Sequence, residues 1–277
     1  MANPNKKPDL LELGKSLTER GPVKILPTSR RVRILYRDVY IVDTTSALYV
    51  WEHEYYPYYY VPATSFDSEC KLVPHTKPDT KDPHYWTAKL TGLSQTTDRI
   101  LVFSDKTTQP QKALKGMVRV EFGIADAWFE EDVPIYVHPK DPFRRVDVLH
   151  STRPLKIYVC GTLVAKTNSA YHLYETGLPC RYYVPATAVD RPALFESETT
   201  TACPYKGVAN YYGVRVLINK EREASRIERL HDLVWYYKTP TLECANIAGF
   251  LCFYQEHESV VIKLDGRELP RPKTPWP

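Results

Sequence analysis

The segment Tyr59-Tyr60-Val61-Pro62-Ala63-Thr64 decides the fold class, because it recurs unchanged as Tyr182-Tyr183-Val184-Pro185-Ala186-Thr187. The two copies lie 123 positions apart, from Val61 to Val184. After a single one-residue gap the match extends upstream, pairing three residues, Thr45, Ala47 and Glu52, with Thr167, Ala170 and Glu175. A period of this length is the size of a domain, not of a solenoid repeat of about 20–50 residues. We therefore predict two tandem copies of one folding unit.

Chain length agrees with this organisation. At roughly 150 residues per domain, 277 residues make two domains. The 21 Tyr and 23 Pro against 11 Gly favour extended strands and rigid turns. We predict an N-terminal helical extension (residues 1–29), a first repeat (30–150), a second repeat (151–267) and a Pro-rich tail (268–277).

Short alternating apolar runs predict strands. Val32, Ile34 and Tyr36 alternate with polar residues, and two further runs follow at 40–42 and 48–51, which is typical of an antiparallel meander. The second copy repeats this pattern around a turn at Cys160-Gly161. Later strands are expected at 100–104, 118–122, 211–218, 233–237 and 260–264. The predicted class is mainly β (α+β by strict count): two compact antiparallel domains with few short helices, related by a pseudo-twofold axis.

Two helices are expected. Leu10, Leu13 and Leu17 have helical spacing after Asp9 as an N-cap and before Gly21 as a stop, although a loosely attached arm is the alternative. The second is predicted from Leu242 to Tyr254, after Thr241 as a cap. The corresponding part of the first copy is taken as 134–142, where two prolines forbid a helix. In that alignment Trp128 matches Trp235.

Charge and cysteine usage narrow the class of partner. A net charge of +4, with 37 basic and 33 acidic residues interspersed, is too weak to indicate nucleic-acid binding. Without a signal-peptide pattern or a long apolar run, we expect a cytoplasmic protein, nuclear location not excluded, that has no membrane association. Six cysteines form no CxxC pair and eight histidines form no HxH or HExxH, so neither a metal nor another cofactor is expected. A homodimer is compatible with the sequence.

Several motifs resemble those of the domain-of-unknown-function family 427, which also carries a nucleotidyltransferase label, in its tandem fungal form. The resemblance covers nearly the whole chain and implies a compact, β-rich fold with little helix. It does not imply an established mechanism, and no glycine-rich phosphate loop or Asp-x-Asp metal pair supports nucleotidyl transfer. Besides the repeated hexapeptide, it rests on residues 126–132, 136–142, 174–179, 203–207 and 265–266.

The stretch His138-Pro139-Lys140-Asp141-Pro142 is the first candidate site. It holds an imidazole, an ammonium and a carboxylate on a backbone stiffened by two prolines. His138 could act as a general acid or base oriented by Asp141 or Asp126, while Lys140 or Arg144 neutralises a substrate anion. The alternative is a tight structural loop in which His138 and Asp141 bond to the backbone.

The stretch Cys203-Pro204-Tyr205-Lys206-Gly207 is the second candidate. A thiol near a lysine can be nucleophilic, so Cys203 could be catalytic, and Tyr205 or Lys206 could contact a ligand. A structural turn with Lys206 in solvent is the alternative. The first copy has Asp82-Pro83-His84-Tyr85-Trp86 near the same place, so a site built on this motif should occur once.

Glu52 and Glu175 occupy equivalent positions and form the third candidate. If the pseudo-twofold axis brings them together, they could share a proton or a metal; otherwise each accepts backbone N–H bonds in its own turn. Three more residues, Arg181, Tyr183 and Trp235, are expected to contact a ligand, although such aromatics more often belong to the core.

These candidates lead to a functional hypothesis. We expect a small-molecule-binding protein with acid/base chemistry on a polar or anionic metabolite, in a cleft formed by the two repeats. A non-catalytic scaffolding module for a protein partner is the alternative, and nucleotidyl transfer is disfavoured.

Overall fold

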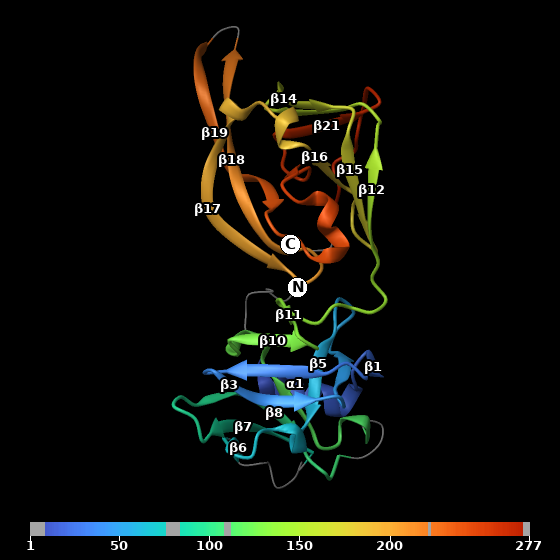
Figure 1. Cartoon of the computed structure of the whole chain (residues 1–277), viewed down its shortest axis with the longest axis vertical. Coiled ribbons are helices and arrows are strands. Elements are labelled where there is room, and N and C mark those ends of the chain that lie inside the picture. The colour runs from blue at the N-terminus through green and yellow to red at the C-terminus, as the bar shows by residue number, and fades with distance from the viewer. Residues whose placement is uncertain (1–8, 76–83, 108–111, 221–222, 274–277) are drawn as a thin grey trace. The chain divides into compact units, whose positions relative to one another are not determined.

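The computed structural model describes residues 9–75, 84–107, 112–220 and 223–273 (Figure 1). It divides into two compact units, residues 1–141 and 142–277, which are described separately. In the described residues, no helix combines the length and apolar character needed to span a bilayer.

The first unit contains two antiparallel sheets. Seven strands form the larger sheet in the order β1 (Lys24–Pro27), β4 (Leu48–Trp51), β5 (Tyr58–Pro62), β9 (Met117–Val120), β8 (Thr97–Phe103), β7 (Tyr85–Thr91) and β6 (Lys71–Pro74). Four strands form the smaller sheet in the order β11 (Val133–Ile135), β10 (Ala127–Glu130), β2 (Val32–Tyr36) and β3 (Val39–Thr44).

The second unit repeats this topology strand for strand. Its larger sheet has the order β12 (Val146–Ser151), β15 (Ala170–Glu175), β16 (Arg181–Val184), β20 (Leu251–Phe253), β19 (Glu223–Tyr237), β18 (Gly207–Lys220) and β17 (Leu194–Cys203). Its smaller sheet has the order β14 (Thr162–Thr167), β13 (Leu155–Val159), β21 (Val260–Leu264) and β22 (Arg267–Glu268). The tandem, mainly β architecture predicted from the hexapeptide is thus confirmed.

The strand pairing differs from the predicted meander in one respect. β2 and β3 pair with each other, but β4 pairs with β1 and β5 in the larger sheet. The chain therefore changes sheets after β3, and in the second unit it does so after β14. β12 opens the second unit by pairing with β15, so the boundary drawn from the sequence at residues 150 and 151 falls inside this strand.

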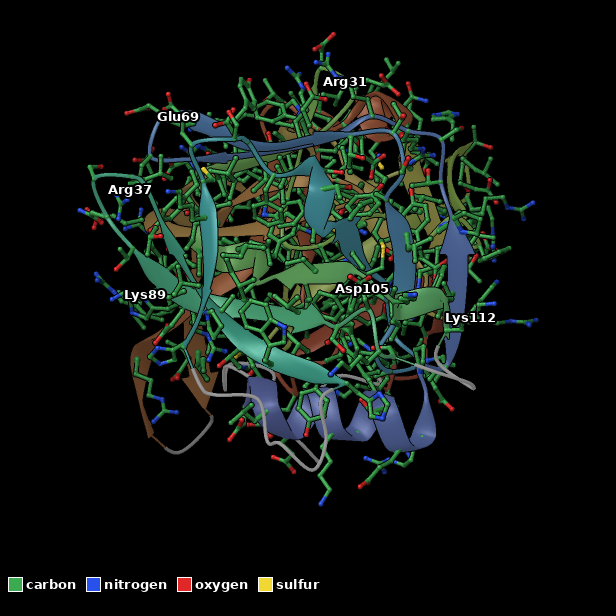
Figure 2. All side chains as sticks on the ribbon, turned by 90° about the horizontal axis from the view of Figure 1, so that it is seen from below. Arg31, Arg37, Glu69, Lys89, Asp105 and Lys112 are labelled. Carbon is green, nitrogen blue, oxygen red and sulfur yellow. The ribbon has the colours of Figure 1, made fainter. Side chains whose placement is uncertain are left out.

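The helix α1 (Leu10–Arg20) agrees with the sequence prediction. The side chain of Asp9 accepts hydrogen bonds from the backbone N–H groups of Leu11 and Glu12, and Gly21, with φ of 76°, ends the helix. Its buried residues are Leu10, Gly14 and Leu17. The helix packs against β7 and β8, so it is part of the first unit and not a loose arm. Figure 2 shows α1 lying along this unit, while charged side chains such as those of Arg37 and Lys89 point outward at its rim.

The helix predicted from Leu242 to Tyr254 is wrong. A short 3-10 helix, η6 (Leu242–Ile247), is followed by Gly249 with φ of 72° and then by strand β20. The hydroxyl of Thr241 donates to the carbonyl of Tyr205 and does not cap a helix. All three residues of β20 are buried between β16 and β19. Periodicity alone cannot distinguish such a short apolar run from a buried helical segment.

The predicted match of Trp128 with Trp235 is also wrong. Trp128 lies in β10, opposite Ile34 in the smaller sheet. Trp235 lies in β19 of the larger sheet, opposite Cys252, and the same place in the first unit is held by Leu101, opposite Arg119. The first-unit counterpart of η6 is consequently the 3-10 helix η2 (Lys112–Leu114), which precedes β9, and not residues 134–142.

Each larger sheet has a hydrophobic cluster on both faces. One face packs on the smaller sheet through Ile34 and Val61 in the first unit, and through Ile157 and Val184 in the second. The opposite face differs between units, because α1 has no counterpart in the second. Residues 123 positions after α1 run from 133 to 143 and include Pro139 and Pro142, which are incompatible with the interior of a helix.

Candidate functional site

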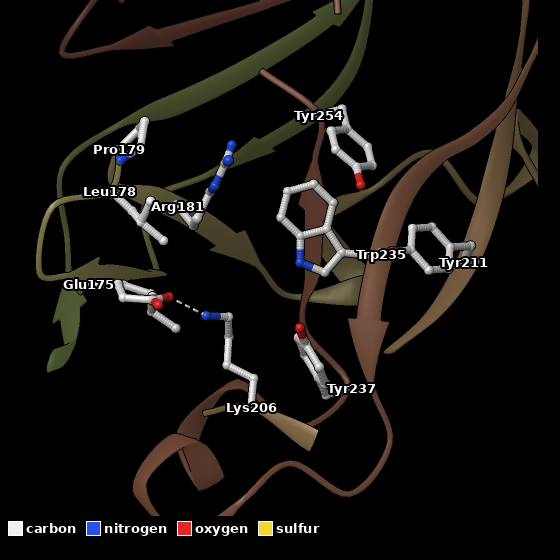
Figure 3. Close-up of a pocket in the computed structure, with 10 residues that line it drawn as sticks. Glu175, Leu178, Pro179, Arg181, Lys206, Tyr211, Trp235, Tyr237 and Tyr254 are labelled. Carbon is white, nitrogen blue, oxygen red and sulfur yellow. Dashed lines mark hydrogen bonds and ion pairs between the residues drawn. The ribbon is translucent and has the colours of Figure 1, made fainter. Parts of the chain in front are cut away.

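A pocket of about 190 Å³ lies in the second unit, on the face of the larger sheet opposite the one that packs on the smaller sheet (Figure 3). β15 contributes Leu173 and Glu175, which point to the same side because they are two residues apart. β19 contributes Trp235 and Tyr237 by the same alternation. The complete lining is Leu173, Glu175, Leu178, Pro179, Arg181, Lys206, Tyr211, Trp235, Tyr237 and Tyr254.

A buried ion pair closes one side of the pocket. The Nζ atom of Lys206 lies 2.5 Å from Oε2 of Glu175, and the two side chains are only 11% and 7% exposed. Burial opposes the charge on Lys206, but its electrostatic interactions with Cys203 and Glu175 and its hydrogen bond to Glu175 outweigh this effect and raise the pKa of Lys206. The pocket therefore contains a charged ammonium in an environment largely shielded from water, where electrostatic interactions are strong.

A second cation lines the pocket beside an aromatic ring. Arg181 donates from both terminal nitrogens to Glu256, at 2.8 and 2.5 Å, and its guanidinium carbon lies 5.4 Å from the ring centre of Trp235. The indole N–H of Trp235 donates to the hydroxyl of Tyr183 at 3.0 Å, which fixes the plane of the ring. Tyr254 packs against the same ring, with centroids 4.6 Å apart. The aromatic wall is therefore rigid.

The first unit places its cation differently. Glu52, the counterpart of Glu175, pairs with Arg119 at 2.6 Å, and these side chains are 6% and 2% exposed. Arg119 belongs to β9, whereas its counterpart in β20 is the uncharged Cys252. In the second unit the cation comes instead from the turn between β17 and β18, which carries Lys206. In both units a basic side chain of the same repeat pairs with the glutamate carboxylate, and Glu52 also accepts a hydrogen bond from the hydroxyl of Tyr60 at 3.0 Å; none of these described partners is a backbone amide.

Helix α1 covers the corresponding face of the first unit. Leu17, 1% exposed, packs in one cluster with Val50, Leu101 and Phe103, which correspond to Leu173, Trp235 and Tyr237 of the pocket. Gly14 lies so close to the ring of Tyr85 that a Cβ atom there would come within 2.3 Å of it. The face is thus closed in the first unit and hollowed in the second.

The residues proposed around His138 have other described partners. The ring of His138 is buried and stacks on Tyr56 at 3.9 Å, and its Nδ1 lies 2.7 Å from the carbonyl oxygen of Pro139. Oδ2 of Asp141 accepts from the indole of Trp51 at 3.1 Å. Asp126 is exposed and accepts from the backbone N–H of Asp38, in the β2–β3 turn, at 3.4 Å. These contacts fit the structural interpretation, and an acid/base role for His138 stays a prediction.

The motif 203–207 forms the turn between β17 and β18, as the structural interpretation expected, but its lysine points into the protein. Cys203 is half-buried and pairs with Gly207 across the hairpin. The carbonyl of Tyr205, a buried residue, accepts from Thr241 and from the thiol of Cys244. Lys206 reaches the pocket, whereas Cys203 and Tyr205 are not among its lining residues.

Four of the predicted ligand-contacting residues line one pocket: Glu175, Arg181, Lys206 and Trp235. Tyr183 lies behind Trp235, and Glu52 and Lys140 belong to the first unit. Sequence reasoning missed the rest, among them Tyr237 and Tyr211. Tyr237 could have been found from the sequence, because it lies two residues after Trp235 in the same predicted strand; the pairing of Tyr211 with Trp235 across β18 and β19 is visible only in the structure. In the described part of the chain, no group of three or more His, Cys, Asp or Glu side chains could hold a metal ion.

Comparison with protein families agrees with the duplicated topology. The model of a domain of unknown function, DUF427, matches the chain twice, over residues 24–131 and 147–265. The chain belongs to the DUF427 family. Each match runs from the first strand of a larger sheet into the smaller sheet, so each corresponds to one structural repeat, and α1 precedes the first DUF427 match. No curated protein matches the chain significantly.

Proposed function

We propose that the second DUF427 repeat binds a small organic molecule in the pocket beside Lys206. The observation that carries the proposal is the juxtaposition of a buried, charge-paired ammonium with a fixed aromatic wall around an open volume. Ligand sites typically combine apolar walls with a few oriented polar groups in this way. Enzymes also use such sites, but the geometry itself supports binding.

The volume limits the size of the ligand. An apolar cavity of about 150 Å³ accommodates benzene, and pockets for drug-sized molecules usually exceed about 300 Å³. A pocket of about 190 Å³ therefore suits a molecule with a single ring or one of similar size. This range leaves out a complete nucleoside triphosphate, so the proposal does not extend to nucleotidyl transfer.

The proposal assigns one site of this kind to the chain. In the first repeat α1 covers the corresponding face, and Leu17 packs in one cluster with Val50 and Leu101. The duplicated fold is thus used asymmetrically: one repeat retains the closed face, and the other binds the ligand.

A thermal-shift screen of single-ring compounds tests this proposal. A ligand at 100 times its dissociation constant adds about 2.7 kcal/mol to the stability of the state that binds it. The variant Leu178→Trp places a large ring at the half-buried edge of the pocket and should abolish the shift. Leu242→Trp, at a position 90% exposed in the same repeat, is the matched control and should retain it.

Two results would contradict the proposal. One is the absence of any stabilising compound. The other is a compound that stabilises Leu178→Trp as strongly as the unmodified chain, because its site would then lie elsewhere.

A further inference from the structure

We infer that the ligand is a monocyclic carboxylate, held at its charged end by Lys206 and the hydroxyl of Tyr237; this inference rests on the proposed function. Three charged side chains line the pocket, Lys206, Arg181 and Glu175, and two of them are cationic. Glu256, which pairs with Arg181, is not among the lining residues. Each cation is thus already paired with a carboxylate, Lys206 with Glu175 and Arg181 with Glu256, so the case for a carboxylate ligand rests on the remaining N–H donors of Lys206 and on the hydroxyl of Tyr237.

Tyr237 provides an independent indication of a ligand. Its side chain lines the pocket and the residue is only 4% exposed, yet among the described residues its hydroxyl has no hydrogen-bond partner. The hydroxyl oxygen is reached from the pocket, so its O–H can donate to an acceptor that enters there. Figure 3 shows this hydroxyl directed toward the pocket from the side on which Lys206 enters. Burial raises the pKa of Tyr237, so the group remains a donor at neutral pH.

Lys206 has donors to spare. An ammonium carries three N–H bonds, and the described hydrogen bond to Glu175 uses one of them. A carboxylate with one oxygen near Nζ of Lys206 and one near the Tyr237 hydroxyl would receive charge-assisted hydrogen bonds, which are stronger than neutral ones. Glu175 stays in place to hold the ammonium. Because it also repels further negative charge, a monoanion fits better than a dianionic phosphate.

The remaining walls suit a ring. Leu173, Leu178 and Pro179 supply an aliphatic side, and Trp235 supplies an aromatic side whose plane is fixed by Tyr183. A flat ring between them would bury apolar surface on both faces, which favours binding. Lys206 and Tyr237 would therefore bind the carboxylate of the ligand, and the apolar walls would bind its ring.

Isothermal titration of the full chain with benzoate tests the charged end. Benzamide is nearly isosteric and neutral, and phenyl phosphate carries the same ring with more charge. We expect benzoate to bind at least about tenfold more tightly than either, equivalent to about 1.4 kcal/mol. Tyr237→Phe removes only the hydroxyl and should weaken benzoate about tenfold while changing benzamide binding less than twofold. Tyr236→Phe is the matched control, because the adjacent residue faces the opposite side of β19.

Each other outcome overturns the inference in a recognisable way. Equal binding of benzoate and benzamide would show that the pocket does not distinguish a charged ligand from a neutral one. The proposed function would then stand without this ligand class. Tighter binding of phenyl phosphate would assign the site to phosphates. Unchanged benzoate affinity in a stably folded Tyr237→Phe variant would remove the proposed contact. If none of the three binds while another compound from the screen does, only this inference fails; if nothing binds, the proposed function fails with it.

Discussion

Replacing Lys206 alone should destabilise the second unit far more than replacing both Lys206 and its partner Glu175. In Lys206→Met the Glu175 carboxylate, in a side chain only 7% exposed, loses its cation. Loss of one partner from a buried pair typically costs about 3–5 kcal/mol, whereas replacing both partners by neutral groups is often close to neutral. We expect Lys206→Met to cost about 3 kcal/mol and the double variant Lys206→Met with Glu175→Gln to lie within about 1 kcal/mol of the unmodified chain.

Urea unfolding followed by circular dichroism measures these differences. Two compact units allow two transitions, and only the transition of the second unit should move. Lys15→Met is the control, because Lys15 and Glu19 form a pair with side chains 64% and 59% exposed. Such exposed pairs contribute at most about 1 kcal/mol. If Lys206→Met unfolds at the same urea concentration as the unmodified chain, the ion pair is not the buried contact described above.

Three further predictions concern other parts of the chain. Leu17→Ala removes a buried side chain under α1 and should cost the first unit about 2–5 kcal/mol in urea unfolding, while benzoate affinity stays unchanged; a loss of affinity would contradict the separation of the two faces. His138→Ala should lower the stability of the first unit by about 1 kcal/mol, because it removes the stack on Tyr56, and unchanged stability would contradict the structural interpretation of His138. Stability should fall above pH 10, because burial raises the pKa of Tyr59, Tyr60, Tyr183 and Tyr237 in the folded state, whereas the unfolded side chains ionise near their ordinary value of 10.0. The folded state then binds more protons than the unfolded state, so ionisation of the two named tyrosines in each unit should lower the stability of that unit by about 3 kcal/mol by pH 11; flat stability from pH 9 to 11 would refute this.

Much of the fold could be predicted because its signals are local. The repeated hexapeptide reports the duplication directly. Asp9 and Gly21 mark the ends of α1 through hydrogen bonds within a few residues. The turn at Cys160-Gly161 has positive φ at both positions, 49° and 81°, as a two-residue hairpin turn requires. The ends of α1 and the turn at Cys160-Gly161 each depend on neighbours in sequence.

The errors arose where distant strands decide the outcome. Residues 251–253 form a strand only because β16 and β19 lie on either side of them, and nothing within the segment indicates those neighbours. Matching Trp128 with Trp235 by residue type fails because Trp128 belongs to the smaller sheet of its unit and Trp235 to the larger sheet. Sheet order, which sequence spacing does not determine, separates them.

The candidate site shows the same limit. Glu175, Arg181, Lys206 and Trp235 could each be selected by motif or repeat position, but they come from three strands and one turn. Their convergence depends on the order of β15, β16, β20 and β19. The chemically rich segment at His138 has its titratable groups close together in sequence, but closeness in sequence does not establish that they act together.

A crystal structure of the full chain with benzoate bound would test the central claim most directly. We predict electron density for one benzoate in the second repeat, with its carboxylate within hydrogen-bonding distance of Nζ of Lys206 and the hydroxyl of Tyr237, and its ring between Leu178 and Trp235. The corresponding face of the first repeat should remain covered by α1. Benzoate bound only elsewhere, with the pocket beside Lys206 empty, would contradict the assignment of the ligand site to the second repeat.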